Sequence, residues 1–448
     1  MKKLISFLSI ALLCHNINAQ TNPAITSWIR NTTAITGRHY VSGSSTPITD
    51  AYLANVQTVQ YSTTSAYITC TGIPSYIIGP YLDGNPSQGA DNHNIYQIPL
   101  TPVQNTGADI PTTGGTIGVF INGVSLFDYR DGYSYKASTG VNTQMGGDGV
   151  WNRDAILAEK AGFDCAKGHP AMTNYHHHQN PSAFNLDRVV ISSVCNLYLA
   201  DGLYVIDTMH HSPLIGYAYD GFPIYGAYGY KNTDGTGGIV RMKSSYSLRS
   251  ITARSTYYTG ATVAAGPAVS AAFPLGMYRE DYQFTTPTAS QTDYLDIHNG
   301  RFCKTPEYPA GTYAYFCTVD SNHNSTYPYV VGPTFYGTKT VTHITSVPTG
   351  TTTYNPSAAV NALNAAGFNI TVYPNPASDL VAIQCKAPNK VNLAVTLTDM
   401  SGRLVQSQTL YQGSTMCYFD LQAVYGGNYI IKISDGVTVI TTPLTVTK

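Results

Sequence analysis

Short runs of alternating apolar and polar residues, separated by turn residues, recur along this chain and limit the folds it can adopt. Residues 54–70 alternate in this way, and residues 115–135 read as two strands joined by an Asn-Gly hairpin turn. The 40 Gly and 25 Pro supply turns, and the 36 Tyr favour strands. Residues 151–162 form the clearest helical segment, with a glycine at its end. We therefore predict a mainly β protein: a large irregular β-rich domain with few helices, followed by a small C-terminal β-sandwich.

The charge of the chain excludes some classes of partner. Only 11% of the 448 residues are charged, and the net charge is −1. Such a surface offers no electrostatic footprint for nucleic acid or for an anionic membrane. The low charge does not indicate disorder, because 43% of the residues are apolar.

The first 19 residues have the pattern of a secretory signal peptide. Lys2 and Lys3 precede an apolar core over residues 4–13, which is too short to span a bilayer. A polar stretch ending in a small residue follows, so we predict cleavage after Ala19. Leu13 is too large for the position before a lipidated Cys14. These features predict an exported protein with no transmembrane segment.

Removal of the signal peptide leaves seven cysteines, an odd number. At least one thiol is then unpaired or pairs between chains, although an exported protein permits disulfides. Cys385 with Cys417 and Cys303 with Cys317 are two plausible pairs. The sequence leaves the connectivity open.

The end of the chain is predicted to be a separate module. Residues 346–366 are small and polar, which is a linker composition, so the β-rich domain is placed at residues 20–345. Residues 367–448 contain period-2 strands separated by Asn-Pro, Ser-Gly and Gly-Gly turns. This pattern predicts a small antiparallel sandwich.

Four ordered motifs in this module resemble the type A C-terminal sorting domain of the type IX secretion system of Bacteroidetes. The resemblance implies partnership with the secretion machinery and export across the outer membrane, followed by cleavage of the tail or attachment to the cell surface. An ordinary accessory β-sandwich is the alternative. The matching residues are Tyr373-Pro374-Asn375-Pro376, Asp399-Met400-Ser401-Gly402-Arg403, Gly427-Asn428-Tyr429 and the basic C-terminal Lys448.

Histidines gather in the segment FDCAKGHPAMTNYHHHQNP. If residues 175–178 are extended, His176 and His178 share one face of the strand, and Tyr175 and His177 share the other. Two imidazoles on one face can bind a single metal ion. His169 can add a third nitrogen, and Asp164 can add an oxygen or orient a histidine. Three histidines suit zinc or copper, while the alternative is a polar hairpin without metal.

A second group of candidates follows in DTMHHSPLIGYAYDGF. His210 and His211 are adjacent, so only one can face a given site in a strand. We include His211 among the candidate ligands. Asp220 with Glu307 is one of several possible glycosidase pairs, and the sequence alone does not give their separation.

The same region resembles the YHYH-domain family through many ordered motifs that cover most of residues 50–335. The family's Tyr-His-Tyr-His motif corresponds to residues 175–178, where His177 replaces a tyrosine. The two histidines that match the motif are His176 and His178. The resemblance brings no established activity, so it names a family without settling the function. Other matching segments include Gly118-Val119-Phe120-Ile121-Asn122-Gly123-Val124, Trp151-Asn152-Arg153-Asp154-Ala155, Gly168-His169-Pro170, His211-Ser212-Pro213, Tyr219-Asp220-Gly221-Phe222-Pro223-Ile224-Tyr225-Gly226 and Thr305-Pro306-Glu307-Tyr308-Pro309.

A weak internal repeat is also visible. Asp164, Gly168-His169 and residues 175–178 are echoed later by Asp296, Gly300-Arg301 and residues 313–316. The order of residue types matches, but the second copy lacks the histidines. We interpret this as a duplicated β unit in which only the first copy carries a metal site.

Two functions remain open at this point, and the sequence does not decide whether the protein is an enzyme. The first is a secreted or cell-surface protein that binds a transition metal, with Tyr175 near the ligands or a substrate. The second is a non-catalytic surface protein that binds a glycan, another small molecule or a protein through its many tyrosines.

Overall fold

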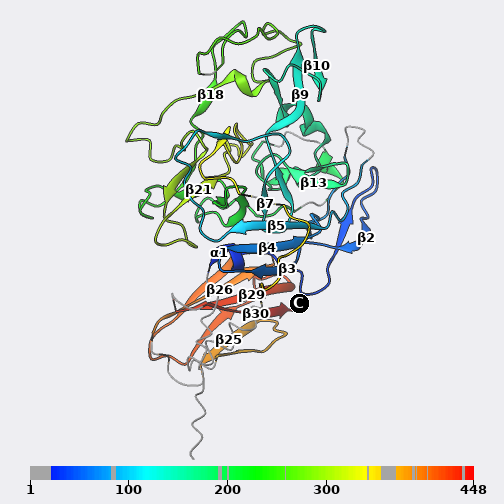
Figure 1. Ribbon diagram of the computed structural model, residues 1–448. Coiled ribbons are helices and arrows are strands. Elements are labelled where there is room, and N and C mark those ends of the chain that lie inside the picture. The colour runs from blue at the N-terminus through cyan, green and yellow to red at the C-terminus, as the bar shows by residue number, and fades with distance from the viewer. Residues whose placement is uncertain are drawn as a thin grey trace, which may run out of the picture. The chain divides into compact units, whose positions relative to one another are not determined.

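The computed structural model describes residues 22–81, 87–189, 194–198, 201–257, 259–340, 343–354, 370–385, 389, 391–400, 402–435 and 439–447 (Figure 1). The chain divides into two compact units, one containing Asn22–Tyr354 and the other containing Asn355–Met400 and Leu404–Lys448. The predicted signal peptide and most of the predicted linker lie outside the described residues. The predicted domain boundaries therefore stay predictions.

The larger unit is built from several small sheets around one eight-stranded sheet. Residues 54–70 form an antiparallel strand pair, as predicted. The two-stranded sheets are β1 (Thr36–His39) with β2 (Ile48–Leu53), β6 (Ile110–Pro111) with β22 (Thr334–Phe335), β16 (Tyr228–Tyr230) with β17 (Ile239–Arg241), and β18 (Tyr246–Leu248) with β19 (Tyr282–Phe284). A four-stranded sheet has the order β23 (Thr352–Thr353), β3 (Val56–Tyr61), β4 (Ser65–Cys70) and β5 (Asn94–Pro99). A three-stranded sheet has the order β10 (Val141–Gln144), β9 (Arg130–Lys136) and β11 (Asn152–Asp154).

Helices are few and short in the described residues, and none has the length and apolarity needed to cross a membrane. They are α1 (Pro23–Thr26), α2 (Ala155–Glu159) and the 3-10 turns η1 (Lys160–Gly162), η2 (Phe184–Leu186), η3 (Val194–Asn196) and η4 (Arg279–Asp281).

The eight-stranded sheet forms the centre of the larger unit and has a mirrored strand order. Its two middle strands pair antiparallel, and each is followed outwards by a hairpin partner, a parallel strand and an edge strand. The order is β12 (His169–Ala171), β13 (Asn174–His177), β8 (Ser125–Phe127), β7 (Thr116–Phe120), β14 (Leu214–Ala218), β15 (Pro223–Tyr225), β21 (Thr312–Phe316) and β20 (Gly300–Cys303). We call β7, β8, β12 and β13 the first half, and β14, β15, β20 and β21 the second half.

The two halves repeat each other in detail. The hairpin turn after β7 contains Gly123 at φ +85°, and the turn after β14 contains Gly221 at φ +88°. In the middle of the sheet, the Ile121 amide donates to the Ile215 carbonyl, and the Tyr219 amide donates to the Ile117 carbonyl. These matched contacts confirm the predicted duplication.

A pair of a buried tyrosine and a carboxylate occurs in each half. The Tyr175 hydroxyl donates to Asp164 at 2.9 Å, and the Tyr313 hydroxyl donates to Asp296 at 2.8 Å. Each tyrosine hydroxyl packs against a glycine, Gly168 in the first half and Gly300 in the second. The contact is so close that a residue with a Cβ atom would not fit at either glycine position. Equivalent pairs in both halves indicate that these residues build the scaffold.

Helix α2 is shorter than the sequence predicted. Residues 152–154 form strand β11, and the helix begins at Ala155 because the buried Asp154 carboxylate accepts from the Ile156 and Leu157 amides as its N-cap. A 3-10 turn continues the segment to Gly162, where the sequence placed its end. The prediction that the helix begins at residue 151 was therefore wrong, because residues 152–154 form a strand and the helix begins after it.

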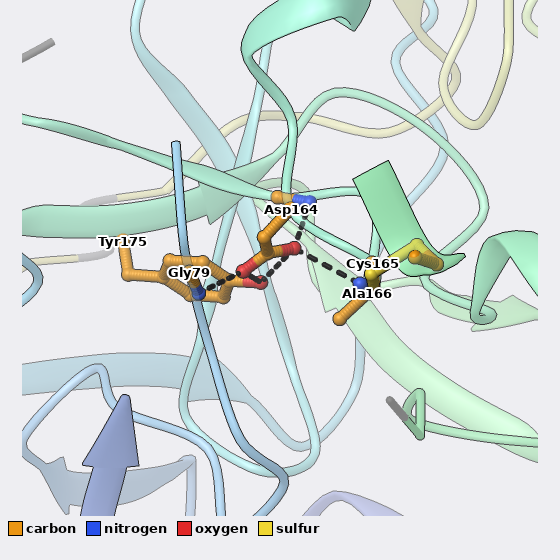
Figure 2. The surroundings of a disulfide bond; sticks show 7 residues. Gly79, Asp164, Cys165, Ala166 and Tyr175 are labelled. Atoms are coloured by element: carbon orange, nitrogen blue, oxygen red, sulfur yellow. Dashed lines mark hydrogen bonds between the residues drawn. A yellow bond between two sulfur atoms is a disulfide. The ribbon is translucent and has the colours of Figure 1, made fainter. Parts of the chain in front are cut away.

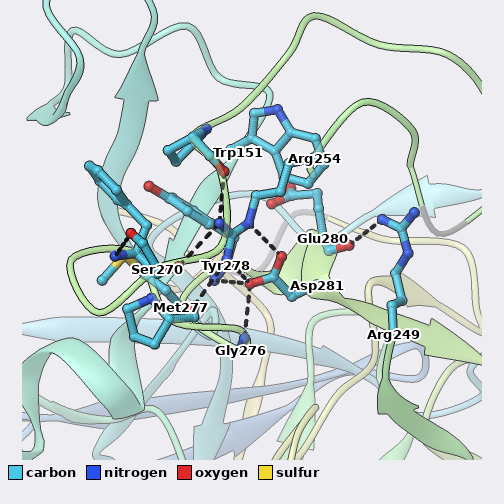
Figure 3. Close-up of polar contacts among 12 residues, drawn as sticks. Trp151, Arg249, Arg254, Ser270, Gly276, Met277, Tyr278, Glu280 and Asp281 are labelled. Atoms are coloured by element: carbon cyan, nitrogen blue, oxygen red, sulfur yellow. Dashed lines mark hydrogen bonds and ion pairs between the residues drawn. The ribbon is translucent and has the colours of Figure 1, made fainter. Parts of the chain in front are cut away.

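A buried polar cluster fixes the start of this segment (Figure 3). The Asn152 amide donates to Glu280 at 2.8 Å, and the Asp154 amide donates to the Met277 carbonyl at 2.9 Å. In the same cluster Arg254, fully buried, forms a two-pronged ion pair with Asp281, with both contacts at 2.8 Å. The bonds of Asn152 and Asp154 fix the position of β11, and they therefore fix the direction of α2, which begins directly after it.

The smaller unit is a sandwich of two antiparallel sheets, as predicted. Apolar side chains from both sheets fill its core, including Ile383, Leu397 and Phe419, all fully buried. Alternating burial along β29 is the pattern expected of strands with one face in a core. One sheet has the order β24 (Ile370–Tyr373), β25 (Leu380–Cys385) and β28 (Met416–Asp420). The other has the order β27 (Leu404–Leu410), β26 (Leu393–Asp399), β29 (Gly427–Ser434) and β30 (Val439–Val446).

The cysteine pairs suggested by the sequence are wrong. All four of those thiols are free, and the disulfide joins Cys165 to Cys195 (Figure 2). Register explains one failure: Cys303 lies opposite Thr312, so Cys317 is five residues further along β21 and past its end, roughly 17 Å away. In the sandwich, Cys417 lies opposite Ile383, so Cys385 is only a diagonal neighbour, at a spacing too wide for a disulfide.

Candidate metal centre

The β12–β13 hairpin brings the histidines together. His169 pairs directly with His176 in the antiparallel register, and β13 is extended as the sequence predicted. Since side chains alternate along a strand, His176 and His178 point to one face and His177 points to the other. The Nε2 atoms of His176 and His178 lie 3.1 Å apart, while Nε2 of His177 lies 2.7 Å from the hydroxyl of Tyr76.

One nitrogen from each of His169, His176 and His178 lies within 4.8 Å of the others. The three residues are 6%, 2% and 3% exposed. Oε2 of Glu159, the last residue of α2, lies 3.3 Å from Nε2 of His169 and 3.3 Å from Nε2 of His178. Three histidine nitrogens therefore converge in one buried space, and the Glu159 carboxylate lies beside two of them.

Several of these atoms lack ordinary hydrogen bonds. Neither ring nitrogen of His169 nor Oε2 of Glu159 makes a complete hydrogen bond. Buried polar atoms are almost always satisfied, because an unsatisfied one costs about 1–3 kcal/mol. A cation among them would satisfy the three histidines and the carboxylate together.

The spacing suits a small tetrahedral ion. Two ligands held 2.0–2.1 Å from a tetrahedral metal lie about 3.3 Å from each other. The three separations His176–His178, His169–Glu159 and His178–Glu159, at 3.1, 3.3 and 3.3 Å, are close to that edge length.

Backbone carbonyls fix the orientation of two of the rings. Nδ1 of His176 donates to the Asn174 carbonyl at 2.9 Å, and Nδ1 of His178 donates to the Asp128 carbonyl. A carbonyl can only accept, so the proton lies on Nδ1 and the Nε2 lone pair faces the group. This is the arrangement usually found for histidines that bind metals.

Aromatic rings close the space around the group. Phe127 stacks on His176 with ring centroids 3.8 Å apart, and Phe163 meets His169 edge-on at 4.8 Å. They keep water from the donor atoms and raise the cost of any uncompensated charge there.

The carboxylate and the imidazoles perturb one another. Burial raises the pKa of Glu159, but the close polar contacts and charges of His169 and His178 outweigh it and lower this pKa to about 2. Burial and the two neighbouring imidazoles hold the pKa of His176 well below its usual value. For His178, burial lowers the pKa and Glu159 raises it, with a net upward shift. The group thus contains a firmly ionised carboxylate beside at least one neutral imidazole.

A family model described as YHYH protein matches residues 95–328, just over half of the chain. The chain belongs to the YHYH protein family. The candidate group lies inside the matched region, and its residues His176 and His178 are the histidines of the family motif.

A second model, described as the secretion system C-terminal sorting domain, matches residues 371–447. The resemblance of the C-terminal module is therefore confirmed. The YHYH protein is exported, either released or attached to the outer surface, and its partner in export is the type IX secretion machinery.

Other comparisons add little. No curated protein matches the sequence. Among solved structures, the chain is similar to dimeric latent PorU from Porphyromonas gingivalis, at 19% identity and a TM-score of 0.15. The match covers 17% of this chain and only 9% of that one, so it carries no argument about the YHYH domain.

Asp164 does not join the histidines of the YHYH domain, although the sequence placed it with them. Its carboxylate, fully buried, accepts from the amides of Gly79, Ala166 and Gly168 and from the Tyr175 hydroxyl (Figure 2). No described histidine contacts it. Asp164 is a loop-capping residue, and Tyr175 is its buried partner instead of a substrate contact.

His211 also lies apart from the group. Its Nδ1 donates to the Ser212 carbonyl at 2.7 Å, and its ring packs against Tyr225 and Phe316 of the second half. His210, its neighbour, is exposed and bonds Asp207.

The possible glycosidase pair is not supported by the contacts of its members. Asp220 is fully buried, and its Oδ2 accepts from the Tyr315 hydroxyl and the Gly337 amide. Glu307 accepts from the Tyr225 hydroxyl instead.

Sequence reasoning missed Glu159. The helical segment that carries it was recognised, but Glu159 reaches the histidines only through the fold. The one available signal was its position in an unusually polar helix end that precedes the histidine segment by a few residues.

Proposed function

We propose that this protein is an exported transition-metal-binding protein, with an ion held in the YHYH domain by His169, His176 and His178 and by Glu159 as the fourth ligand. The convergence of three buried histidines, with the Glu159 carboxylate beside two of them and with Nε2 of His169 and Oε2 of Glu159 lacking complete hydrogen bonds, is the observation that carries the proposal.

The donor set limits the metal. Three imidazoles and one carboxylate suit zinc or copper, and tetrahedral spacing favours zinc or cuprous copper over cations that prefer oxygen. Four protein ligands complete a tetrahedron without water, which is typical of a site that stabilises the fold or handles electrons. We therefore do not assign a hydrolytic reaction to it.

The first test is metal analysis of the untagged mature chain. We expect one zinc or copper ion per chain in the wild type and none in His176→Ala/His178→Ala. The matched control is His210→Ala, which removes an exposed histidine outside the group and should keep the metal. Chelation should lower the melting temperature of the wild type and leave the double variant unchanged. A wild type without stoichiometric metal and with unchanged melting on chelation overturns the proposal.

The second test concerns Glu159. Glu159→Gln preserves the size of the side chain and removes its charge. We expect metal affinity to fall by about 10- to 100-fold, measured by competition with a chromogenic chelator. Unchanged affinity would remove Glu159 from the ligand set while leaving the three histidines in it.

A further inference from the structure

Residues 128–130 link β8 to β9 and support the candidate metal centre at two places. The carbonyl of Asp128 accepts from Nδ1 of His178, and the carbonyl of Tyr129 accepts from the first amide of α2 at 2.8 Å. Glu159 is the last residue of that helix. The segment therefore holds one histidine directly and the carboxylate through its helix.

An ion pair locks this segment. The Asp128 carboxylate is fully buried, and the Arg130 guanidinium contacts both of its oxygens, with Nε 2.7 Å from Oδ1 and a terminal nitrogen 2.9 Å from Oδ2. The backbone amide of Arg130 donates to the same carboxylate at 3.0 Å. The Asp128 amide donates to the Gly115 carbonyl at 2.8 Å, and the guanidinium also donates to the Thr112 carbonyl at 2.6 Å. Because a two-pronged pair fixes direction as well as distance, the Asp128 carbonyl has little freedom to turn.

The second half of the sheet lacks this ion pair, as it lacks the histidines. The hairpin turns after β7 and β14 correspond, and the strands that follow them, β8 and β15, pair with equivalent positions of β13 and β21. The same correspondence places Gly226 at the position of Asp128 and Tyr228 at the position of Arg130. Glycine and tyrosine cannot form an ion pair. The duplicated scaffold therefore folds without the pair, which occurs in the half that carries the histidines.

We propose that Asp128 and Arg130 are positioning residues of the metal centre, which orient His178 and set its distance from Glu159. The inference rests on the proposed function and adds the residues that determine the geometry of the site. The two side chains bond each other and act on the ligands through the backbone of residues 128–130. Without the pair, the imidazole of His178 turns more freely and can carry its proton on either nitrogen. Binding of the ion must then order that ring first, which lowers the affinity.

The test variant is Asp128→Asn/Arg130→Met in the untagged mature chain. It removes both charges together, so no unpaired charge stays buried, and the amide oxygen at position 128 can still accept from the backbone amide of residue 130. We expect zinc affinity to fall by about 10- to 100-fold, measured by competition with a chromogenic chelator. The visible absorption bands of the cobalt-substituted protein should shift, because they depend on the arrangement of the ligands around the ion.

A readout without metal separates this inference from the proposed function. Nitrogen NMR of the metal-free chain at about pH 9, where histidines are neutral, shows which ring nitrogen of His178 carries the proton. We expect the Nδ1–H form in the wild type and a mixture of both forms in Asp128→Asn/Arg130→Met. A wild type without metal overturns the proposed function, whereas a wild type that binds metal with the proton position unchanged in the variant overturns the positioning role alone.

Two further variants complete the test. Lys243→Met/Asp293→Asn removes another ion pair of the larger unit, with Nζ 2.7 Å from the carboxylate, and should leave zinc affinity, the cobalt bands and the proton position of His178 unchanged. Arg130→Lys keeps the charge but loses the two-pronged contact, so we expect zinc affinity to fall by about 3- to 10-fold. This variant decides the question if the double variant fails to fold. Wild-type zinc affinity and unshifted cobalt bands in either folded variant of the Asp128–Arg130 pair overturn the inference.

Discussion

The first half of the eight-stranded sheet carries His169, His176 and His178, whereas the second half carries Arg301, Ala314 and Phe316 at the equivalent positions. Both halves keep the tyrosine–carboxylate pair and the glycine against which the tyrosine packs. The second half folds without histidines, so the scaffold does not require them. This difference separates residues that build the fold from residues that add a chemical capability.

The largest expected effect concerns the disulfide, whose Cys165 follows Asp164 of the first half's tyrosine–carboxylate pair. Cys165→Ser/Cys195→Ser opens a loop with a sequence separation of 30 residues, and we expect a loss of about 3–4 kcal/mol in the free energy of unfolding. Urea unfolding measures it. The second-half comparison is Cys303→Ala, a free buried thiol, for which about 1 kcal/mol is expected. Equal losses in the two variants would remove this asymmetry.

The next effect tests what the halves share. Asp164→Asn and Asp296→Asn each place an amide group where the carboxylate accepts backbone and tyrosine hydrogen bonds. We expect each variant to lose about 2–3 kcal/mol of stability, since at least one buried donor is left unsatisfied. Thermal unfolding of both variants, without metal, measures the loss. A neutral effect in one half alone would show that the two pairs are not equivalent.

The smallest effect tests the opposite face of β13. His177→Tyr restores the residue of the family motif and matches Tyr315 in the second half. Because His177 already contacts the Tyr76 hydroxyl, the longer ring displaces Tyr76 and should cost about 1–2 kcal/mol. Metal content should not change, since His177 points away from the histidine group. Metal loss in this variant would contradict the separation of faces.

The strand period made part of this site predictable. His176 and His178 were placed on one face because side chains alternate along a strand, and the structure brings their Nε2 atoms together. His169 followed because the turn between β12 and β13 is short. The duplication was visible because its marker residues recur in the same order in both copies.

Other features depend on contacts that the sequence does not encode locally. Asp164 lies near His169 in sequence, but its carboxylate accepts hydrogen bonds from three backbone amides and therefore caps a loop instead of binding a metal. Cys195 lies in an irregular segment with no strand pattern, so nothing paired it with Cys165. Glu159 becomes a candidate ligand only because the cap at Asp154 sets where α2 begins and ends.

The strands in the middle of the sheet have a consequence for the origin of the domain. Val119 pairs with Tyr217, and the flanking pairs Gly118 with Ala218 and Phe120 with Gly216 are exchanged by a two-fold rotation. This self-complementary pairing is the interface that two separate copies of one half would form as a symmetric dimer. A gene of half the length, dimerising through this edge and later fused in tandem, accounts for the architecture. It also implies that a fragment ending between the halves exposes an open strand edge and is prone to self-association.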